Sequence, residues 1–264
     1  MADSADNRRD DGSTALVPLK EERGISFVQF ALEPPFDARL VFWERRDSVT
    51  ASSFRLLRQR LIDRGDPKTI LCTSALRGEG KTTLAANLAL ALAELTKFRV
   101  LLLETSLRDA AIGEIFGFKP PQGFGRQLAL HKANPGSPWV VVQINGLPLY
   151  ILAAEPRCCP SCAAVLTQEA SFCGMCGNKA EPEEPVPIDA VAFASAIRRF
   201  RESFQYIVVD APPVLQSGDV NLIQDTTDAI VFATRRGRSE SRDLQRAIEQ
   251  VAPAQVAAVA LIED

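Results

Sequence analysis

The residues with the clearest chemistry lie in one short segment of the chain, Ser74-Ala75-Leu76-Arg77-Gly78-Glu79-Gly80-Lys81-Thr82-Thr83. An apolar run at 69–73 precedes it and an alanine- and leucine-rich run follows it, so we expect a strand, a glycine turn and a helix in that order. Gly78 and Gly80 can adopt positive φ, and they leave the backbone N–H groups open to an anion. The start of the helix adds unpaired N–H groups and a partial positive charge. This arrangement predicts a cradle for phosphate.

Two side chains of this segment indicate which phosphate it holds. Lys81 can reach the β- and γ-phosphates of a nucleotide, and the hydroxyl of Thr82 can bind a magnesium ion. Glu79 and Thr83 complete the predicted nucleotide-binding set with the two glycines. The strict P-loop pattern has glycine where Ala75 stands. We therefore predict that the chain binds a nucleoside triphosphate with Mg²⁺, or descends from a protein that did; a structural turn without a ligand is the plain alternative.

Carboxylates that can reach such a metal ion follow two other apolar runs. One apolar triplet ends in Asp210, which Ala-Pro-Pro follows, and another ends in Glu104. The carboxyl ends of neighbouring parallel strands meet at one edge of a sheet, where phosphate sites form. We predict Asp210 as a magnesium ligand beside Thr82, and Lys81, Glu104 and Asp210 as catalytic residues. Asp210 as a simple turn cap and Glu104 as a solvated carboxylate stay open as alternatives.

Short apolar runs alternate with helical patterns along the chain. The expected strands are Thr69–Thr73, Val100–Leu103, Leu149–Ala153, Tyr206–Val209, Ala229–Ala233 and Val256–Ile262. The expected helices are 48–64, Lys81–Leu95, Ala111–Phe116, Ala190–Phe204, Val220–Asp225 and Ser239–Gln250. Nearly all-apolar strands alternating with helices indicate an α/β fold, here a P-loop NTPase with a mostly parallel β-sheet flanked by helices.

The size and charge of the chain limit its class. At 264 residues it suits one α/β domain with a tail or a small insertion, and its net charge of −3 argues against nucleic-acid binding. No apolar run approaches the ~18 residues that span a bilayer, and the N-terminus lacks a signal-peptide core, so we expect a cytoplasmic location. We expect a disordered tail at 1–23 and a P-loop domain at 24–264 that begins with an irregular strap at 24–46.

Five of the six cysteines lie close together in the second half of the chain. Two Cys-x-x-Cys pairs among them are the predicted ligands of Zn²⁺: Cys159, Cys162, Cys173 and Cys176. In a reducing compartment such clustering indicates a metal rather than disulfides, which stay open as an alternative together with unpaired thiols. The segment 155–187 is thus predicted to be an inserted zinc ribbon with a linker. Cys158 is the expected odd cysteine, and its replacement of Cys159 as a ligand stays open as an alternative. Because a four-thiolate site has no open coordination position, we expect a docking surface for a protein partner rather than catalysis.

Three motifs in a fixed order carry a resemblance to a known family. They are Gly-Glu-Gly-Lys-Thr-Thr at 78–83, Glu-Thr-Ser-Leu-Arg at 104–108 and Asp-Ala-Pro-Pro at 210–213. From about residue 48 to 264, apart from the cysteine-rich segment, the chain resembles the bacterial tyrosine kinases, the cytoplasmic kinase domains of capsule and exopolysaccharide export systems within the ParA/MinD-like P-loop class. The resemblance implies ATP and Mg²⁺ as cofactors and transfer of the γ-phosphoryl group to tyrosines. It also implies a homo-oligomer at the inner face of the membrane, with a membrane-anchored activator or co-polymerase as partner.

The chain departs from that family at positions that do chemistry. Where the family has Asp-x-Asp-x-Arg, this chain has Glu104, Ser106 and Arg108, so the first carboxylate has a longer arm and the second is absent. The family's contact helix carries Glu-x-x-Arg-x-x-Arg; Arg55 and Arg58 are kept here and the glutamate is not. Removing one charged group that acts in the transition state costs about 2.7–4 kcal/mol, or roughly 100- to 1000-fold in rate. We hypothesise an ATP-binding kinase homologue with weak or absent self-phosphorylation.

Two other functions remain open at this point. The first is a ParA/MinD-type ATPase for positioning or partitioning, although that class places a lysine where Leu76 stands. The second is a non-enzymatic nucleotide-binding adaptor that works through its zinc ribbon. Arginines at 235, 236, 238 and 242 follow an expected strand, and they either help to hold phosphate or form a solvated basic loop. His131, the only histidine, is expected in a polar loop, and Tyr150 and Tyr206 are expected to pack in strands.

Overall fold

The computed structural model describes residues 16–95, 97–166, 170–180 and 188–263. Within them, the strands form one sheet in the order β1-β2-β5-β6-β4-β7-β3-β8-β9. The strands are β1 (Val17–Glu22), β2 (Ile25–Phe30), β3 (Thr69–Ser74), β4 (Val100–Glu104), β5 (Trp139–Ile144), β6 (Leu149–Leu152), β7 (Tyr206–Asp210), β8 (Ala229–Arg235) and β9 (Val256–Ile262). From β6 to β9 every neighbouring pair is parallel, and only the β1–β2 and β5–β6 pairs are antiparallel. The predicted mostly parallel sheet is confirmed.

The central strands are apolar throughout because helices cover both faces of the sheet. Every residue of β3, β4 and β7 is buried. The register pairs Glu104 with Asp210, and Asp210 with Cys72, so these neighbouring strands end at the same level. Side chains at the carboxyl ends of β3, β4 and β7 therefore meet at one edge of the sheet.

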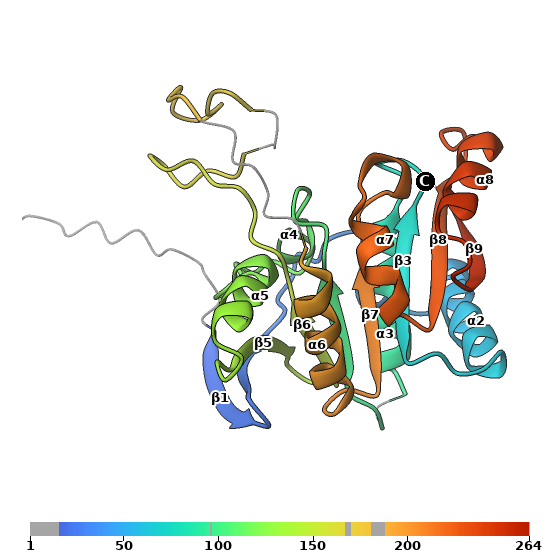
Figure 1. Cartoon of the computed structure of the whole chain (residues 1–264), viewed down its shortest axis with the longest axis horizontal. Coiled ribbons are helices and arrows are strands. Elements are labelled where there is room, and N and C mark those ends of the chain that lie inside the picture. Colours follow the sequence, from blue (N-terminus) through green and yellow to red (C-terminus); the bar gives the residue numbers. More distant parts are fainter. Residues whose placement is uncertain (1–15, 96, 167–169, 181–187, 264) are drawn as a thin grey trace, which may run out of the picture.

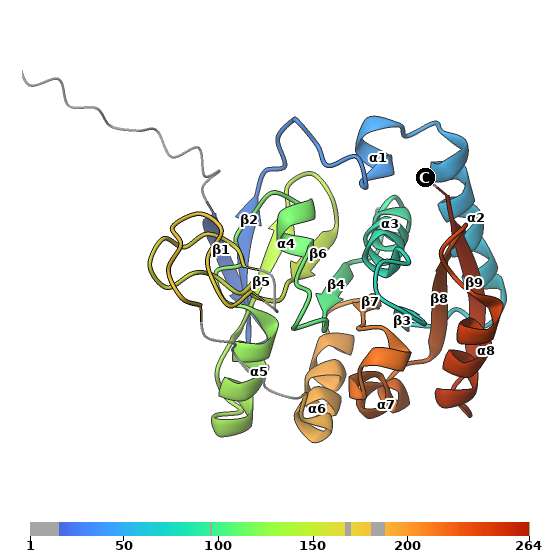
Figure 2. The same cartoon turned by 90° about the horizontal axis from the view of Figure 1, so that it is seen from above.

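The helices form a layer on each face of the sheet (Figures 1 and 2). One layer holds α1 (Val41–Glu44), α2 (Val49–Asp63), α3 (Lys81–Ala93) and α4 (Ile112–Ile115). The other holds α5 (Phe124–Ala133), α6 (Ala190–Arg201), α7 (Asp219–Ile223) and α8 (Ser241–Gln250). None of the helices in the described ranges has the length and apolar character needed to cross a bilayer.

Helix α3 lies at the centre of the first layer and carries the first residues of the predicted site. After its first turn it is apolar apart from the buried Asn87, and Leu84, Leu88 and Leu92 are almost completely buried between the sheet and the neighbouring helices. Helix α2 packs beside it through Phe54 and Leu61. A helix held so firmly along its length fixes the position of its own N-terminus.

The N-terminal part of the chain differs from the prediction. Residues 17–22, expected in a disordered tail, form β1, and the expected irregular strap contains β2 and α1. A tight turn at Arg23 and Gly24, both with positive φ, joins β1 to β2. Strand β1 exposes five of its six residues. It therefore has no buried face that a run of apolar residues in the sequence could indicate. Residues 1–15 lie outside the described residues.

Two further elements were not predicted, helix α5 and strand β5. His131 lies in α5 and stacks on Trp139 of β5, with ring centroids 3.9 Å apart, so the expectation of a polar loop was wrong. Trp139 also packs edge-on against Phe200 of α6 at 4.9 Å. An aromatic cluster therefore holds α5 and α6 together on this face.

The cysteine-rich segment projects away from the sheet between β6 and α6 (Figure 1). Its described parts, 155–166 and 170–180, contain two single antiparallel bridges, Cys158 with Val165 and Phe172 with Lys179. A core of its own consists of four buried residues, Cys159, Leu166, Cys173 and Ala180. Each half is thus a small hairpin, and cysteine makes up half of the core that they share.

Candidate nucleotide-binding site

The glycine turn after β3 has the backbone geometry of a phosphate cradle. Gly78 and Gly80 have φ of 83° and 93°, a region that favours glycine, and Gly80 is the N-cap of α3. Glu79 is buried, and its carboxylate accepts a hydrogen bond from the backbone N–H of Leu76 at 2.8 Å. The turn is therefore closed by its own side chain. Ala75 is buried in the core beneath it.

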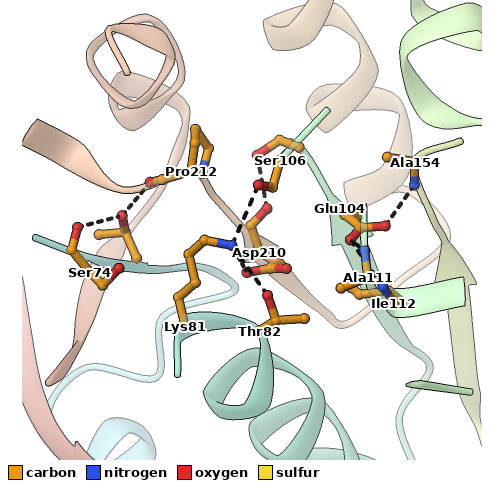
Figure 3. A network of polar contacts seen from close by, with 12 residues as sticks. Ser74, Lys81, Thr82, Glu104, Ser106, Ala111, Ile112, Ala154, Asp210 and Pro212 are labelled. Carbon is orange, nitrogen blue, oxygen red and sulfur yellow. Dashed lines mark hydrogen bonds and ion pairs between the residues drawn. The ribbon is translucent and has the colours of Figure 1, made fainter. Parts of the chain in front are cut away.

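Lys81 brings three elements together at the carboxyl edge of the sheet (Figure 3). Its Nζ lies 3.3 Å from the hydroxyl of Thr82 on α3 and 3.4 Å from the hydroxyl of Ser106 after β4. The same atom lies 4.0 Å from Oδ1 of Asp210 at the end of β7. The structure thus brings together Lys81, Thr82 and Asp210, and it adds Ser106.

Asp210 is buried beside this ammonium group without a full set of partners. Its side chain is 0% exposed, and neither carboxylate oxygen has a hydrogen-bond partner in the described part of the chain. Burial raises the pKa of Asp210, and the positive charge of Lys81 opposes the rise. A buried carboxylate and a hydroxyl with free oxygen lone pairs match the ligands that Mg²⁺ prefers. These residues therefore fit a magnesium ion bound with a triphosphate.

Glu104 lies next to Asp210 in the sheet, but its carboxylate is already fully used (Figure 3). One oxygen accepts hydrogen bonds from the backbone N–H groups of Ala111 and Ile112, at 2.6 and 3.0 Å. The other accepts one from the N–H of Ala154 at 2.9 Å. Burial, and second the charge of Asp210, raise the pKa of Glu104 to about 7. Its contacts are those of a residue that positions the loop before α4, and its predicted role at the metal or as a catalytic group stays untested.

The loop after β4 also contacts the glycine turn directly. Asp109 of this loop forms an ion pair with Arg77 of the turn at 2.5 Å. Ser106 of the same loop is buried next to Lys81. The sequence pointed to Ser106 only as a missing carboxylate, and it held no signal for the Arg77–Asp109 pair.

The four predicted zinc ligands converge in the cysteine-rich segment. The sulfur atoms of Cys159, Cys162, Cys173 and Cys176 all lie within 4.8 Å of one another. The Cys159–Cys176 and Cys162–Cys173 sulfur atoms are 3.7 and 3.6 Å apart. A disulfide needs about 2.05 Å, whereas four sulfurs around zinc at ~2.3 Å are separated by about 3.8 Å. The spacing fits a tetrahedral metal site, and Cys158 lies outside the cluster.

The two arginines of the predicted contact motif, Arg55 and Arg58, are engaged within this chain. Arg55 forms two hydrogen bonds to the carboxylate of Glu94, at 2.7 and 2.8 Å. Arg58 donates to the backbone oxygen of Ala91 at 2.5 Å and lies 3.5 Å from the same carboxylate. Their side chains are 29% and 14% exposed, so both are largely covered by their contacts within the chain. They fasten α2 to the C-terminal end of α3.

No protein-family model matches the chain. The relatives that are similar in sequence include two tyrosine-protein kinases from different bacteria. The chain is 24% identical to tyrosine-protein kinase CpsD of Streptococcus agalactiae over 78% of its own length and 80% of the relative. It is 25% identical to tyrosine-protein kinase YwqD of Bacillus subtilis over 78% of its own length and 76% of the relative. The resemblance to the bacterial tyrosine kinases is confirmed.

Solved structures show the same fold. The chimerical protein CapA2B2 has a TM-score of 0.66 and 20% identity, covering 88% of this chain and 91% of that one. The kinase domain of the Escherichia coli tyrosine kinase ETK has a TM-score of 0.61 and 14% identity, covering 85% and 79%. MinD of Pyrococcus horikoshii, solved with Mg-ADP, reaches a TM-score of 0.52 with 20% identity, covering 74% and 69%. The chain has the P-loop NTPase fold shared by tyrosine kinase domains and MinD.

Proposed function

We propose that this protein binds Mg-ATP and acts as a protein-tyrosine kinase in the regulation of capsule or exopolysaccharide synthesis and export. The observation that carries the proposal is the buried carboxylate of Asp210, whose oxygens lack hydrogen-bond partners among the described residues, beside Lys81 and Thr82. Such a set fits a metal-bound triphosphate. Sequence similarity to tyrosine-protein kinases along most of the chain supports the substrate class.

Each residue of the cradle has a separate task in this proposal. The backbone N–H groups around Gly78 and Gly80 bind the β-phosphate, and Lys81 binds the β- and γ-phosphates. Thr82 and Asp210 hold Mg²⁺, which neutralises the charge of the phosphates when it is bound. Glu79 holds the turn closed through its hydrogen bond from the N–H of Leu76. Thr83 lies in the first turn of α3, next to the proposed phosphate position.

Phosphoryl transfer by this site is expected to be slow. Ser106 offers a hydroxyl to Lys81 where the family has a carboxylate. Glu104 cannot replace that carboxylate while it accepts three backbone hydrogen bonds. Loss of one transition-state charge corresponds to roughly 100- to 1000-fold in rate. Nucleotide binding does not depend on that charge and should be kept.

The acceptor tyrosine is proposed to lie on another protein. The chain has two tyrosines, and Tyr150 and Tyr206 are 6% and 3% exposed. The hydroxyl of Tyr206 donates a hydrogen bond to Asp66 at 2.7 Å, far along the strand from Asp210. Buried side chains such as these are poor acceptors for a phosphoryl group. The family similarity supports two kinds of partner. One is a membrane-anchored activator at the inner face of the membrane, and the other is further copies of this chain.

The cysteine cluster is proposed to bind one Zn²⁺ and to form a docking surface. The sulfur spacing near that of a zinc tetrahedron supports the metal. Val165, Phe172 and Met175 of this segment are 65%, 65% and 80% exposed. Large apolar side chains on a small projecting unit are typical of a protein-binding surface.

Two other functions are less well supported. A MinD-type ATPase has the fold in common with this chain, but Leu76 occupies the place of the lysine that this class uses. A non-enzymatic adaptor would keep the ribbon as its working surface. It would bind nucleotide without hydrolysing it or transferring phosphate.

Incubation of the purified protein with labelled ATP and a tyrosine-containing polymer tests the kinase proposal. We expect slow, Mg²⁺-dependent phosphotyrosine on the polymer, none on this chain, and none with Lys81→Ala. Release of phosphate without phosphotyrosine would support the ATPase instead. Bound nucleotide with neither reaction, with or without a membrane partner, would support the adaptor.

A further inference from the structure

A compact turn between β8 and α8 brings arginines to the glycine turn. The backbone N–H groups of Arg238 and Ser239 donate to the carbonyl oxygen of Arg235, at 3.1 and 2.9 Å. The N–H of Arg235 in turn donates to the hydroxyl of Ser239 at 2.7 Å. Gly237 between them has a φ of 73°. Since β8 pairs directly with β3, this turn lies beside the end of β3.

The guanidinium group of Arg238 lies against Gly78. A Cβ atom built on Gly78 would come within 2.8 Å of the Cζ atom and both Nη atoms of Arg238. Equal distances to these three atoms mean that the flat face of the guanidinium covers the side of Gly78 where a side chain would project. Nη1 of Arg235 lies 3.5 Å from the carbonyl oxygen of the same glycine. The absence of a side chain at position 78 makes this close approach possible.

The neighbouring arginines have carboxylate partners, and Arg238 has none among the described residues. Arg236 is paired with Glu263 at 3.0 Å, and Arg77 with Asp109 at 2.5 Å. Across the described ranges, no acidic side chain forms an ion pair with Arg238, which is exposed to solvent. A guanidinium beside a turn that is open to anions has an evident type of ligand, because its planar donors match phosphate oxygens.

We propose that Arg238 is a second cationic side chain, besides Lys81, that binds the phosphate tail of the nucleotide. This inference rests on the proposed nucleotide binding and extends it with a residue from outside the P-loop motif. The turn between β8 and α8 supplies the charge within the same chain. Binding of a phosphate by Arg238 also joins β8 and α8 to the cradle.

Affinity measurements with two probes test the proposal, Mg-ATP and magnesium tripolyphosphate. The tripolyphosphate has the phosphates but no base or sugar, so it isolates contacts to the phosphate tail. We expect Arg238→Ala to weaken both probes by about 10- to 100-fold, as for a lost hydrogen bond to a charged group. Arg238→Lys should recover part of the loss. Arg236→Ala is the matched control in the same turn, and it should change neither affinity more than about twofold, well below the tenfold step of 1.4 kcal/mol.

The other outcomes separate this inference from the proposed function. Equal affinities of the Arg238→Ala and Arg236→Ala proteins would overturn the inference and leave nucleotide binding intact. Weaker ATP binding with unchanged tripolyphosphate binding would also overturn it, because Arg238 would then stack on the base. Failure of the wild-type protein to bind Mg-ATP would overturn the proposed function itself. Circular dichroism of each variant checks that it is folded.

Discussion

The glycine turn and the cysteine cluster are the two proposed ligand sites of this protein, and the chain organises them in opposite ways. The turn joins β3 to α3, and α3 is buried along nearly its whole length in the main core. The cysteine cluster has four buried residues as its own core, two of them proposed metal ligands. Apolar burial therefore fixes the first site before any ligand arrives. The second has too little apolar surface to fold alone.

The difference shows where the free energy of each site comes from. At the proposed nucleotide site, the fold holds Asp210 buried with its carboxylate oxygens free of hydrogen-bond partners in the described chain, so a ligand would use a geometry that already exists. In the cysteine segment, we propose that the metal supplies the free energy that the core lacks. One site should survive loss of its ligand, and the other should not.

Metal removal is expected to produce the largest effect and would break this comparison most directly. Zinc contributes an apparent ~10–16 kcal/mol in small zinc domains, so a chelator should unfold the segment around the cysteines and leave the sheet intact. Hydrogen exchange followed by mass spectrometry would show rapid exchange confined to that segment. Cys159→Ser should behave like the chelated protein.

Cys158→Ser is the matched control for the metal site, since Cys158 lies outside the cluster. It should keep one zinc per chain and normal exchange. A metal-free protein with a fully protected segment would show that the comparison is wrong.

Substitution of Asp210 is expected to produce the next largest effect, a loss of affinity for Mg-ATP. Asp210→Asn removes the charged ligand of Mg²⁺, so we expect Mg-ATP affinity to fall by about 100-fold, as for removal of one key charged group. Binding of ATP in the presence of EDTA should change little. Asp225→Asn, a change of an exposed aspartate outside the proposed site, serves as control. An Asp210→Asn protein that binds Mg-ATP normally would remove Asp210 from the metal site.

Glu104 offers a further test, because its protonation and its hydrogen bonds are expected to stabilise the loops around the proposed nucleotide site. Its pKa is raised from 4.5 to about 7, so folding takes up a proton in this window. Stability due to this group is therefore present below pH 4.5 and is lost as the pH rises through 7, by on the order of 3 kcal/mol. Glu104→Gln should remove that slope and cost about 1–3 kcal/mol by leaving a buried N–H group unpaired.

Thermal unfolding of the wild-type and Glu104→Gln proteins from pH 4.5 to 8 measures this effect. We expect the difference in melting temperature between the wild-type and Glu104→Gln proteins to become smaller as the pH rises. If the two melting temperatures changed with pH in parallel, Glu104 would have the same charge in the folded and unfolded states, and the prediction would be wrong.

The smallest expected effect concerns the support of α3. Arg55→Ala removes the two hydrogen bonds to Glu94, and we expect a loss of about 1 kcal/mol because the pair is partly open to solvent. Denaturant unfolding measures it, with Arg60→Ala on an exposed turn of the same helix as control. A loss above ~3 kcal/mol would mean that the scaffold of the first site depends on a few polar contacts rather than on its core.

The central fold could be predicted because its strands are apolar on both faces. Strands β3, β4, β7 and β8 are found within a residue or two of their expected ends. The N-terminal hairpin could not, since β1 is almost entirely exposed and carries lysine, glutamate and proline. Helix α5 begins between two glycines, which hide its helical pattern.

The site was predictable where spacing alone decides geometry. The motif order was enough to bring Lys81, Thr82 and Asp210 together, and Cys-x-x-Cys spacing was enough for the cysteines. The partners of Glu104 are backbone N–H groups at 111, 112 and 154, whose positions depend on how two loops pack. A sequence contains no direct record of such contacts.

Calorimetric titration of Mg-ATP into the wild-type and Lys81→Ala proteins tests the central claim most directly. If the cradle holds the triphosphate, the wild-type protein binds one nucleotide per chain and reaches its full affinity only when Mg²⁺ is present. The Lys81→Ala protein then gives no measurable heat of binding. Well-folded wild-type protein that gives no binding heat, or a variant that binds as tightly as the wild type, would contradict the claim.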